Sequence, residues 1–166
     1  MQFKVGDVVI HPSHGLGHII GLEEKRLLGK EARLYYEVTI QQSTVWVLVE
    51  VREAPALRPL TARGDLARYR SLLRSLPAPL NQDHRKRRLE LTERLKQGSF
   101  QVVCEVVRDL TARGWRKPLG ETDSTSLRRA REKLCQEWAA SDGVSIAEAT
   151  QEVESLLLES RQAYMA

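Results

Sequence analysis

The sequence has few of the features of an exported, membrane-bound or disulfide-bonded protein. It contains only two cysteines in 166 residues, and both lie on the apolar faces of predicted helices. No apolar run approaches the ~18 residues that a membrane helix requires. The N-terminus "MQFKVGDVV" lacks a charged head, an apolar stretch and a cleavage site. We therefore expect a cytoplasmic protein with two buried thiols and no membrane contact.

Catalytic arrangements are also missing. No Ser/His/Asp, paired-carboxylate or Cys/His pattern provides a nucleophile, a base and an orienting group with a natural common cleft. All four histidines lie in predicted turns or at a helix start. We accordingly expect no enzymatic activity, no cofactor and no small-molecule substrate.

The stretch "HPSHGLGH", residues 11–18, combines three histidines with two glycines inside a β-branched run. A phosphate loop would need a helix after the glycines, whereas the strand-like "HIIGLEE" follows. A structural zinc site would need four closely spaced ligands, and no cysteine or clustered carboxylate joins the histidines. The stretch therefore predicts a tight turn between strands, in which Gly15 and Gly17 supply backbone freedom, and no metal site.

Residues 7–50 favour β-strands. Four segments are rich in Val, Ile, Tyr and Trp and are bounded by turn-forming residues: "DVVIH", "GHIIGLEE", "ARLYYEVTI" and "TVWVLVE". Only the polar "QQS" separates the last two, which is typical of a hairpin. Four or five short strands in this span predict a small, strongly bent antiparallel sheet or barrel.

After "APALRP" the apolar period changes to about 3.6, which predicts helices to the end of the chain. The first predicted helix carries an apolar stripe of Leu66, Tyr69, Leu73 and Leu76. The second spans 82–97 and is capped by Asn81, and the third is capped by Ser99. A loop over 116–124 precedes the fourth helix, and Ser145 and Glu148 form a capping box for the fifth. We expect an α+β chain of two domains: a β domain over residues 1–60 and an all-α domain of about five helices over residues 61–166.

Charge is distributed unevenly along the chain. The net charge of +4 is concentrated in residues 61–118, which carry 14 basic and 6 acidic side chains, whereas residues 1–60 carry 7 of each. A localised basic segment of this kind favours a surface that faces a polyanion.

The candidate DNA contacts lie in "HRKRR", which is too cationic for a core face and suited to salt-dependent phosphate contacts. A merely solvated helix face is the alternative. The candidates are His84, Arg85, Lys86, Arg87 and Arg88, with a second, more diluted strip of Arg128, Arg129 and Arg131.

Trp115 lies in "ARGWRKP", between Arg113 and the pair Arg116 and Lys117, in a predicted loop. Two interpretations remain open. The ring either makes an apolar contact with DNA among these cations, or it closes the core of the helical domain.

Two segments carry a family resemblance. "FKVGDVVIHPSHGLGHIIGLEEKRLLGKEARLYYEV" resembles the N-terminal module of the CarD/CdnL family of bacterial transcription regulators, whose members begin with F-x-x-G-D-x-V-x-Y-P-x-x-G-x-G. His11 replaces the usual Tyr. "LKQGSFQVVCEVVRDL" resembles the family's L-x-x-G-x-x-x-x-x-A-E-V-V-R-D-L segment, and the likeness covers nearly the whole chain. The matching positions are Phe3, Gly6, Asp7, Val9, Pro12, Gly15, Gly17, Leu95, Gly98 and Glu105 to Leu110.

The resemblance implies a Tudor-like N-terminal domain that docks on the β subunit of RNA polymerase. It also implies a helical domain that contacts promoter DNA at the upstream edge of the melted bubble and stabilises the open complex. An edge strand suits such docking, because it can extend a neighbouring sheet. A core position is the alternative for Trp46. The polymerase-facing residues implied by the resemblance are Lys25, Arg26, Val45, Trp46 and Val47.

The sequence departs from the family pattern at the start of the second helix. Family members place a Trp at the start of the second helix, where it acts as an apolar wedge in the minor groove. Asn81 matches the Asn beside that Trp, and either Gln82 or His84 stands in the place of the Trp.

These features predict a cytoplasmic regulator that bridges RNA polymerase and double-stranded promoter DNA and is associated with the nucleoid through the polymerase. An adaptor that docks on the polymerase or another partner without functional DNA binding is the first alternative. An RNA-binding barrel is the second, although that mode needs aromatic platforms with basic neighbours, and the β domain is balanced in charge.

Overall fold

The computed structural model describes residues 2–26, 28–50 and 56–166. The chain divides into two compact units, Met1–Leu60 and Thr61–Ala166. The first two residues of the boundary segment "APALRP" lie outside the described residues. No helix formed by the described residues is both long and apolar enough to cross a bilayer.

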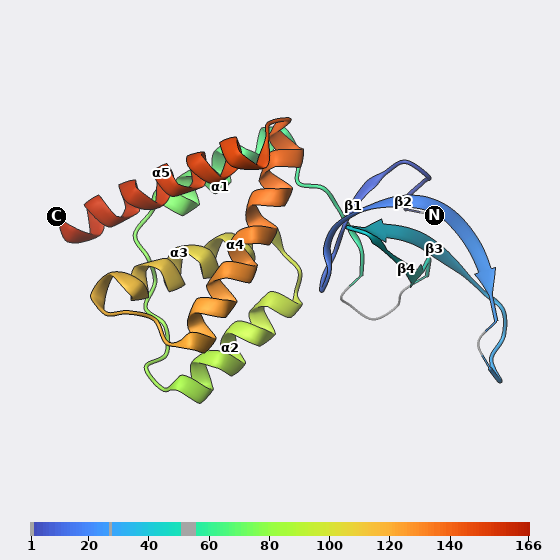
Figure 1. Ribbon diagram of the computed structural model, residues 1–166, viewed down its shortest axis with the longest axis horizontal. Helices are drawn as coiled ribbons and strands as arrows, with labels where there is room; N and C mark the ends of the chain where they lie inside the picture. Colours follow the sequence, from blue (N-terminus) through green and yellow to red (C-terminus); the bar gives the residue numbers. More distant parts are fainter. Residues whose placement is uncertain (1, 27, 51–55) are drawn as a thin grey trace. The chain divides into compact units, whose positions relative to one another are not determined.

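The first unit is an antiparallel sheet of five strands (Figure 1). In chain order the strands are β1 (Val8–His11), β2 (Gly15–Lys25), β3 (Arg33–Ile40), β4 (Ser43–Leu48) and β5 (Arg58–Pro59). Their spatial order is β4-β3-β2-β1-β5. The predicted antiparallel sheet is thus confirmed.

The apolar core of this unit lies on one side of the strands. Val9, Ile19 and Val38 are almost completely buried, and Phe3 packs edge-on against Tyr36 with ring centroids 5.8 Å apart. The Phe3 amide also donates a hydrogen bond to the Tyr36 hydroxyl. The small sheet therefore has a core of its own.

The stretch "HPSHGLGH" forms the expected turn, because β1 and β2 pair from His11 opposite Gly15. The His11 Nδ1 atom accepts hydrogen bonds from the amides of Ser13 and His14, at 3.0 and 3.1 Å. Gly15 has the positive φ expected of a glycine in a turn, at 86°.

Gly17 serves a different purpose from the one expected. Its φ is not positive, but a Cβ atom there would lie 2.7 Å from Ile40 Cγ1 and 2.8 Å from the Thr39 carbonyl oxygen. The close approach of β3, not backbone freedom, therefore requires a glycine. The β3–β4 hairpin is also tighter than expected: Ile40 pairs with Ser43, so the loop has two residues, with Gln41 at a φ of 58°.

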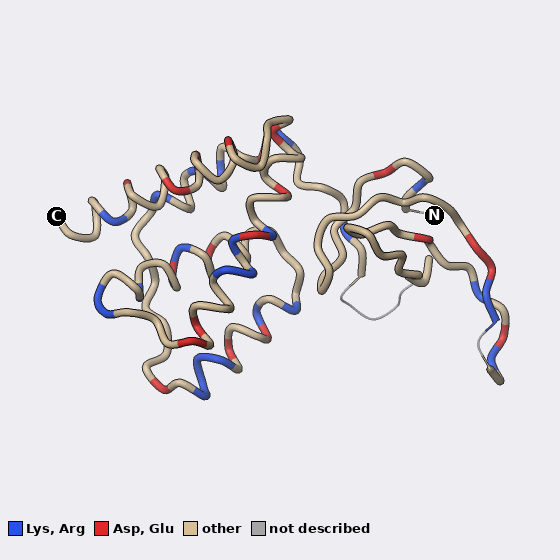
Figure 2. Tube along the Cα trace, viewed as in Figure 1, with Lys and Arg blue, Asp and Glu red and all other residues tan. Residues whose placement is uncertain are grey.

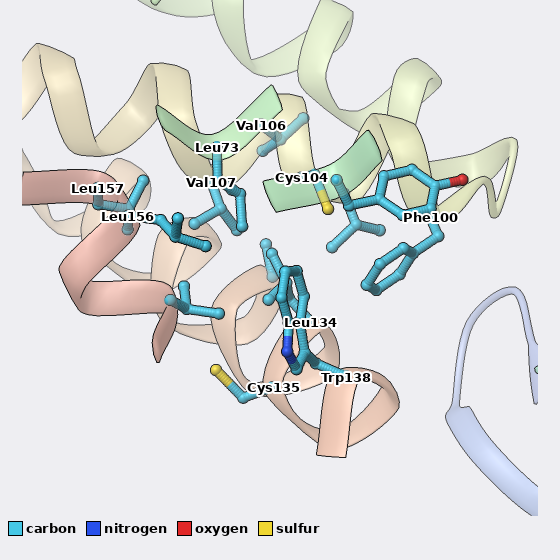
Figure 3. Close-up of a cluster of buried hydrophobic side chains, with 14 of the residues drawn as sticks. Leu73, Phe100, Cys104, Val106, Val107, Leu134, Cys135, Trp138, Leu156 and Leu157 are labelled. Atoms are coloured by element: carbon cyan, nitrogen blue, oxygen red, sulfur yellow. The ribbon is translucent and has the colours of Figure 1, made fainter. Parts of the chain in front are cut away.

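The second unit contains one short 3-10 helix, η1 (Arg63–Asp65), and five α-helices among the described residues. The helices are α1 (Leu66–Arg74), α2 (His84–Lys96), α3 (Phe100–Arg116), α4 (Glu121–Asp142) and α5 (Ile146–Met165). Side chains from α1, α3, α4 and α5 converge on the fully buried Leu134 and Trp138 (Figure 3). Cys104 and Cys135 are free and buried, as expected.

Several helix boundaries differ from those expected. Asp83, not Asn81, caps α2, and its side chain accepts a hydrogen bond from the Lys86 amide. Leu76 lies beyond the end of α1 and is 61% exposed. The fourth helix begins at Glu121, inside the predicted loop. The caps at Ser99 and Ser145 are confirmed.

Candidate functional site

Strand β4 lies at one edge of the sheet and pairs only with β3 among the described strands. Its outward backbone N–H and C=O groups therefore have no strand beside them. Such an edge is a template for pairing with another chain.

Trp46 is on the outer face of β4 and is 41% exposed, which excludes the core position for this side chain. Its Nε1 atom donates a hydrogen bond to Glu23 at 3.1 Å. The Lys25 Nζ atom lies 3.3 Å from the centroid of the ring. The indole is therefore held in place by one hydrogen bond and one cation–π contact. We call Glu23, Lys25, Trp46 and the outer backbone of β4 the sheet-edge site.

The other residues expected near this site differ in how they are placed. Arg26 follows β2 and is exposed. Val45 and Val47 pack against the core of the sheet, because side chains alternate between the two faces of a strand. That the strand containing these residues faces the polymerase stays a prediction, to which Val45 and Val47 contribute their backbone at the sheet edge.

The first turn of α2 is cationic and contains no acidic residue. Cations near a helix N-terminus oppose the macrodipole by typically 0.3–1 kcal/mol each, roughly, at low ionic strength. Figure 2 shows this concentration of basic residues at the start of α2. A local arrangement that works against stability is a feature expected at functional sites.

Three cations in the first two turns of α2 are exposed and have no ion-pair partner within the described part of the chain: Arg85, Lys86 and Arg88. We call them the α2 cation cluster. Because none of the described carboxylates forms an ion pair with them, their charge is available to an anion from outside the protein.

Arg87 behaves differently and corrects the expectation that all four cations are exposed. It is 5% exposed, and its guanidinium lies 2.9 Å from the Asp123 carboxylate at the start of α4. Its Nη1 atom also donates hydrogen bonds to the carbonyl oxygens of Asn81 and Gln82. Arg87 therefore fixes the loop before α2 instead of meeting solvent.

Asp123 connects three helices. Besides Arg87 of α2, it faces Arg113 of α3, whose Nε atom lies 3.7 Å away. Asp123 was not among the residues predicted from sequence. Its role depends on a partner 36 residues away, which no local pattern reveals.

Leu89, which is 67% exposed, was also not among the residues predicted from sequence. It lies one helical turn after Arg85 on the outer face of α2 and directly follows Arg88. The signal for its exposure is the spacing of Arg87, Leu91 and Leu95, which places Leu89 on the opposite side of the helix.

The residues near the expected wedge position are polar and accessible. Gln82 and His84 are both exposed. The His84 Nδ1 atom lies 3.4 Å from the Arg87 guanidinium. The side chain of Asn81 accepts a hydrogen bond from the Asp83 amide and donates one to Glu90, so it shapes the entry to α2.

The second basic strip, on α4, is smaller than expected. Arg128 and Arg129 are exposed, but Arg131 forms an ion pair with Glu154 at 2.7 Å. Desolvation by burial and the nearby Arg129 guanidinium lower the pKa of Lys133 below its ordinary value.

Trp115 lies in the last turn of α3, not in a loop. It is half-buried, and its ring centroid is 5.7 Å from that of Tyr164 on α5. The ring therefore packs at the edge of the helical unit and does not project as a wedge.

Comparison with known proteins gives a consistent assignment for both units. A family model described as "CarD-like/TRCF RID domain" matches residues 3–61, and one described as "CarD, C-terminal domain" matches residues 69–154. A Bacillus subtilis (strain 168) protein named "Putative transcription factor YdeB" is 28% identical over 146 residues. These cover 87% of this chain and 95% of that protein.

Proposed function

Because this chain belongs to the CarD-like family of transcription factors, we propose that it binds both RNA polymerase and promoter DNA. In this proposal the sheet-edge site docks on the β subunit of the polymerase. The α2 cation cluster, with Arg128 and Arg129, contacts the promoter at the upstream edge of the melted bubble. The bridge stabilises the open complex.

The sheet-edge site suits a protein partner for two reasons. The free backbone groups of β4 can pair with a strand of the partner's sheet. Trp46 is already held by Glu23 and Lys25, so little side-chain freedom is lost when a partner covers it. A pre-fixed aromatic residue beside an edge strand is typical of a binding hot spot.

The α2 cation cluster suits the sugar–phosphate backbone. Arg85, Lys86 and Arg88 release counterions from DNA when they contact phosphates, which gives affinity without sequence preference. Leu89 lies among them and offers an apolar contact to the minor groove, where the family's Trp is absent.

The observation that carries the DNA proposal is the unneutralised charge at the start of α2. Arg85 and Lys86 lie in the first turn, where the helix dipole disfavours them, and the exposed Arg88 follows. The buried carboxylate of Asp123 is already paired with Arg87. A bound phosphate would remove this unfavourable electrostatic interaction.

Two variants of the full chain separate the two contacts. We expect Trp46→Ala to weaken binding to RNA polymerase and to leave affinity for promoter duplex unchanged. We expect the triple variant Arg85→Ala/Lys86→Ala/Arg88→Ala to weaken binding to promoter duplex and to leave binding to RNA polymerase unchanged. Each should shorten the lifetime of the promoter open complex.

The matched control for the triple variant is Arg63→Ala/Arg68→Ala/Arg74→Ala, which removes the same charge from η1 and α1. Arg63 and Arg74 are exposed, and their ion pairs contribute little to stability because Asp142 keeps Arg70 as a partner and Glu159 is exposed. If the wild-type chain bound the polymerase but showed no duplex affinity at low salt, the DNA contact would be refuted. An adaptor without functional DNA binding would then be the better description.

A further inference from the structure

A groove of about 460 Å³ lies within the helical unit, and Gln82, just before α2, is one of its lining residues. One wall is the Pro77–Leu80 segment that joins α1 to α2. The other walls are the C-terminal half of α3 and Tyr164 of α5. The function proposed above does not use this groove.

The α1–α2 wall of the groove is fixed by partly buried hydrogen bonds. The Ala78 amide donates to Asp109 of α3 at 3.0 Å, and Asp109 also accepts a hydrogen bond from Arg108 at 2.9 Å. Ser75 is held from two sides, by Arg108 of α3 and by Ser160 of α5. The groove is therefore preformed, which lowers the entropic cost of binding.

The rim of the groove is cationic. Arg113 and Arg116 are one helical turn apart on α3, and Lys117 follows the helix end. Arg116 and Lys117 are exposed and have no acidic partner in the ranges that the structure describes. The acidic residue in the groove, Asp109, is buried and neutralised by Arg108. The net charge of the lining therefore favours an anion.

An aromatic and apolar surface lies next to these cations. The Arg116 guanidinium is 5.3 Å from the centroid of the Tyr164 ring, and Trp115 supports the same ring from α3. Pro77 and Pro79 provide flat apolar surface on the opposite wall. Cations beside an aromatic platform are the combination by which proteins hold single-stranded nucleic acid.

We propose that this groove binds an unpaired nucleotide of a DNA strand. The phosphate is held by Arg116 and Lys117, and the base packs against Tyr164. We take a DNA strand as the source because the exposed cations and the aromatic ring suit a single strand, and because Gln82, in the segment that leads into α2, lines the groove. This inference rests on the proposed DNA-binding function.

The test measures binding to the full chain at fixed salt. The labelled probes are a short oligothymidylate and a duplex of the same length, and the competitor is free thymidine monophosphate. We expect Arg116→Ala/Lys117→Ala and Tyr164→Ala each to lower affinity for the single strand by about fivefold or more. Affinity for the duplex should change less than about twofold. Tyr164→Phe keeps the ring and should retain the wild-type affinity.

The matched control is Arg161→Ala, which removes an exposed cation of α5 outside the groove lining. Equal loss of single-strand affinity in this control and in the groove variants would overturn the proposal. So would competition by free thymidine monophosphate as strong as by the oligothymidylate, because the groove would then serve free nucleotides.

The variants also separate this inference from the proposed function. If Arg85→Ala/Lys86→Ala/Arg88→Ala abolishes duplex binding while the groove variants bind single strands normally, the groove proposal fails and the DNA-binding function stands. If no form of the chain binds duplex but the groove variants lose single-strand affinity, the groove proposal stands and the duplex contact fails.

Discussion

Arg87 and Arg88 are adjacent arginines with opposite environments. Arg87 is buried against Asp123, whereas Arg88 is exposed and has no ion-pair partner among the described residues. Removing one partner of a buried pair leaves an uncompensated charge, while an exposed cation contributes little to stability. One step along the helix therefore separates a structural cation from a candidate DNA contact.

We expect Arg87→Ala to lower the free energy of unfolding by about 2–4 kcal/mol, since only Arg113 would remain near Asp123. Arg88→Ala should change it by less than about 0.5 kcal/mol. Urea denaturation measures both values. For Arg88→Ala, the slope of log affinity for duplex against log salt should also become shallower by about 0.9. Equal destabilisation by the two substitutions would contradict the assigned roles.

Cys135 gives a prediction about pH. Burial raises the pKa of its thiol, although a hydrogen bond to Thr150 and the Arg131 charge act in the opposite direction. The folded state therefore retains the thiol proton at a pH where the unfolded state has lost it. This contribution to stability is complete below the unfolded pKa and is lost as the pH rises through the folded pKa.

The stability of the wild type relative to Cys135→Ala should accordingly be greater near about pH 8 than near about pH 10, as measured by urea denaturation at each pH. The Cys135 thiol should also resist alkylation in the folded protein near about pH 8. Alkylation at the rate of a free thiol would show that the side chain is accessible.

Helix α2 is held in place by few apolar side chains. Leu91 is buried and Leu95 is partly buried, whereas most of the helix is polar. Its start depends instead on the Asp83 cap and on the Arg87–Asp123 ion pair. The position of the α2 cation cluster is therefore set by polar interactions, whose geometry is directional.

The Asp83 cap can be tested as a property of the whole helix. Asp83→Asn keeps the side-chain oxygen that accepts the Lys86 amide, so the free energy of unfolding should change by less than about 0.5 kcal/mol. Asp83→Ala should lower it by about 1 kcal/mol. Both substitutions remove a negative charge beside the α2 cation cluster, so both should strengthen duplex binding, as measured by fluorescence anisotropy. Weaker binding by Asp83→Asn would contradict the proposed surface.

The elements with a strong apolar period were predictable from sequence. Strands β1 to β4 follow from their content of Val, Ile, Tyr and Trp between turn-forming residues, whereas the two-residue β5 was not predicted. The stripe of Val103, Val106, Val107 and Leu110 on α3 follows from spacing alone. The inward position of Val45 and Val47 could also have been predicted, because they alternate with Trp46 along the strand. The burial of Arg87 was not predicted, because a cation is unusual at a core-facing position and its partner, Asp123, belongs to another helix.

At the scale of the whole molecule, the two units carry two different surfaces. The sheet-edge site has an aromatic side chain and free backbone groups, and the helical unit has exposed cations. Their responses to salt should therefore differ, because counterion release dominates only the contact with nucleic acid.

We expect the slope of log affinity for duplex DNA against log salt to lie between about −2.7 and about −4.5. The first value follows from three phosphate contacts by the α2 cation cluster, and the second includes Arg128 and Arg129. Fluorescence anisotropy over a range of salt concentrations measures the slope, and Trp46→Ala should leave it unchanged. A slope near zero would mean that the cations do not contact phosphates.

The three tryptophans occupy three distinct environments. Trp46 is exposed on the sheet, Trp115 is half-buried at the end of α3, and Trp138 is completely buried. Their emission spectra should therefore differ in wavelength and in access to a soluble quencher such as iodide. In variants that retain a single tryptophan, the fluorescence would report on one region of the protein. Trp46 would report on the sheet, Trp115 on the region near the groove, and Trp138 on the integrity of the helical core.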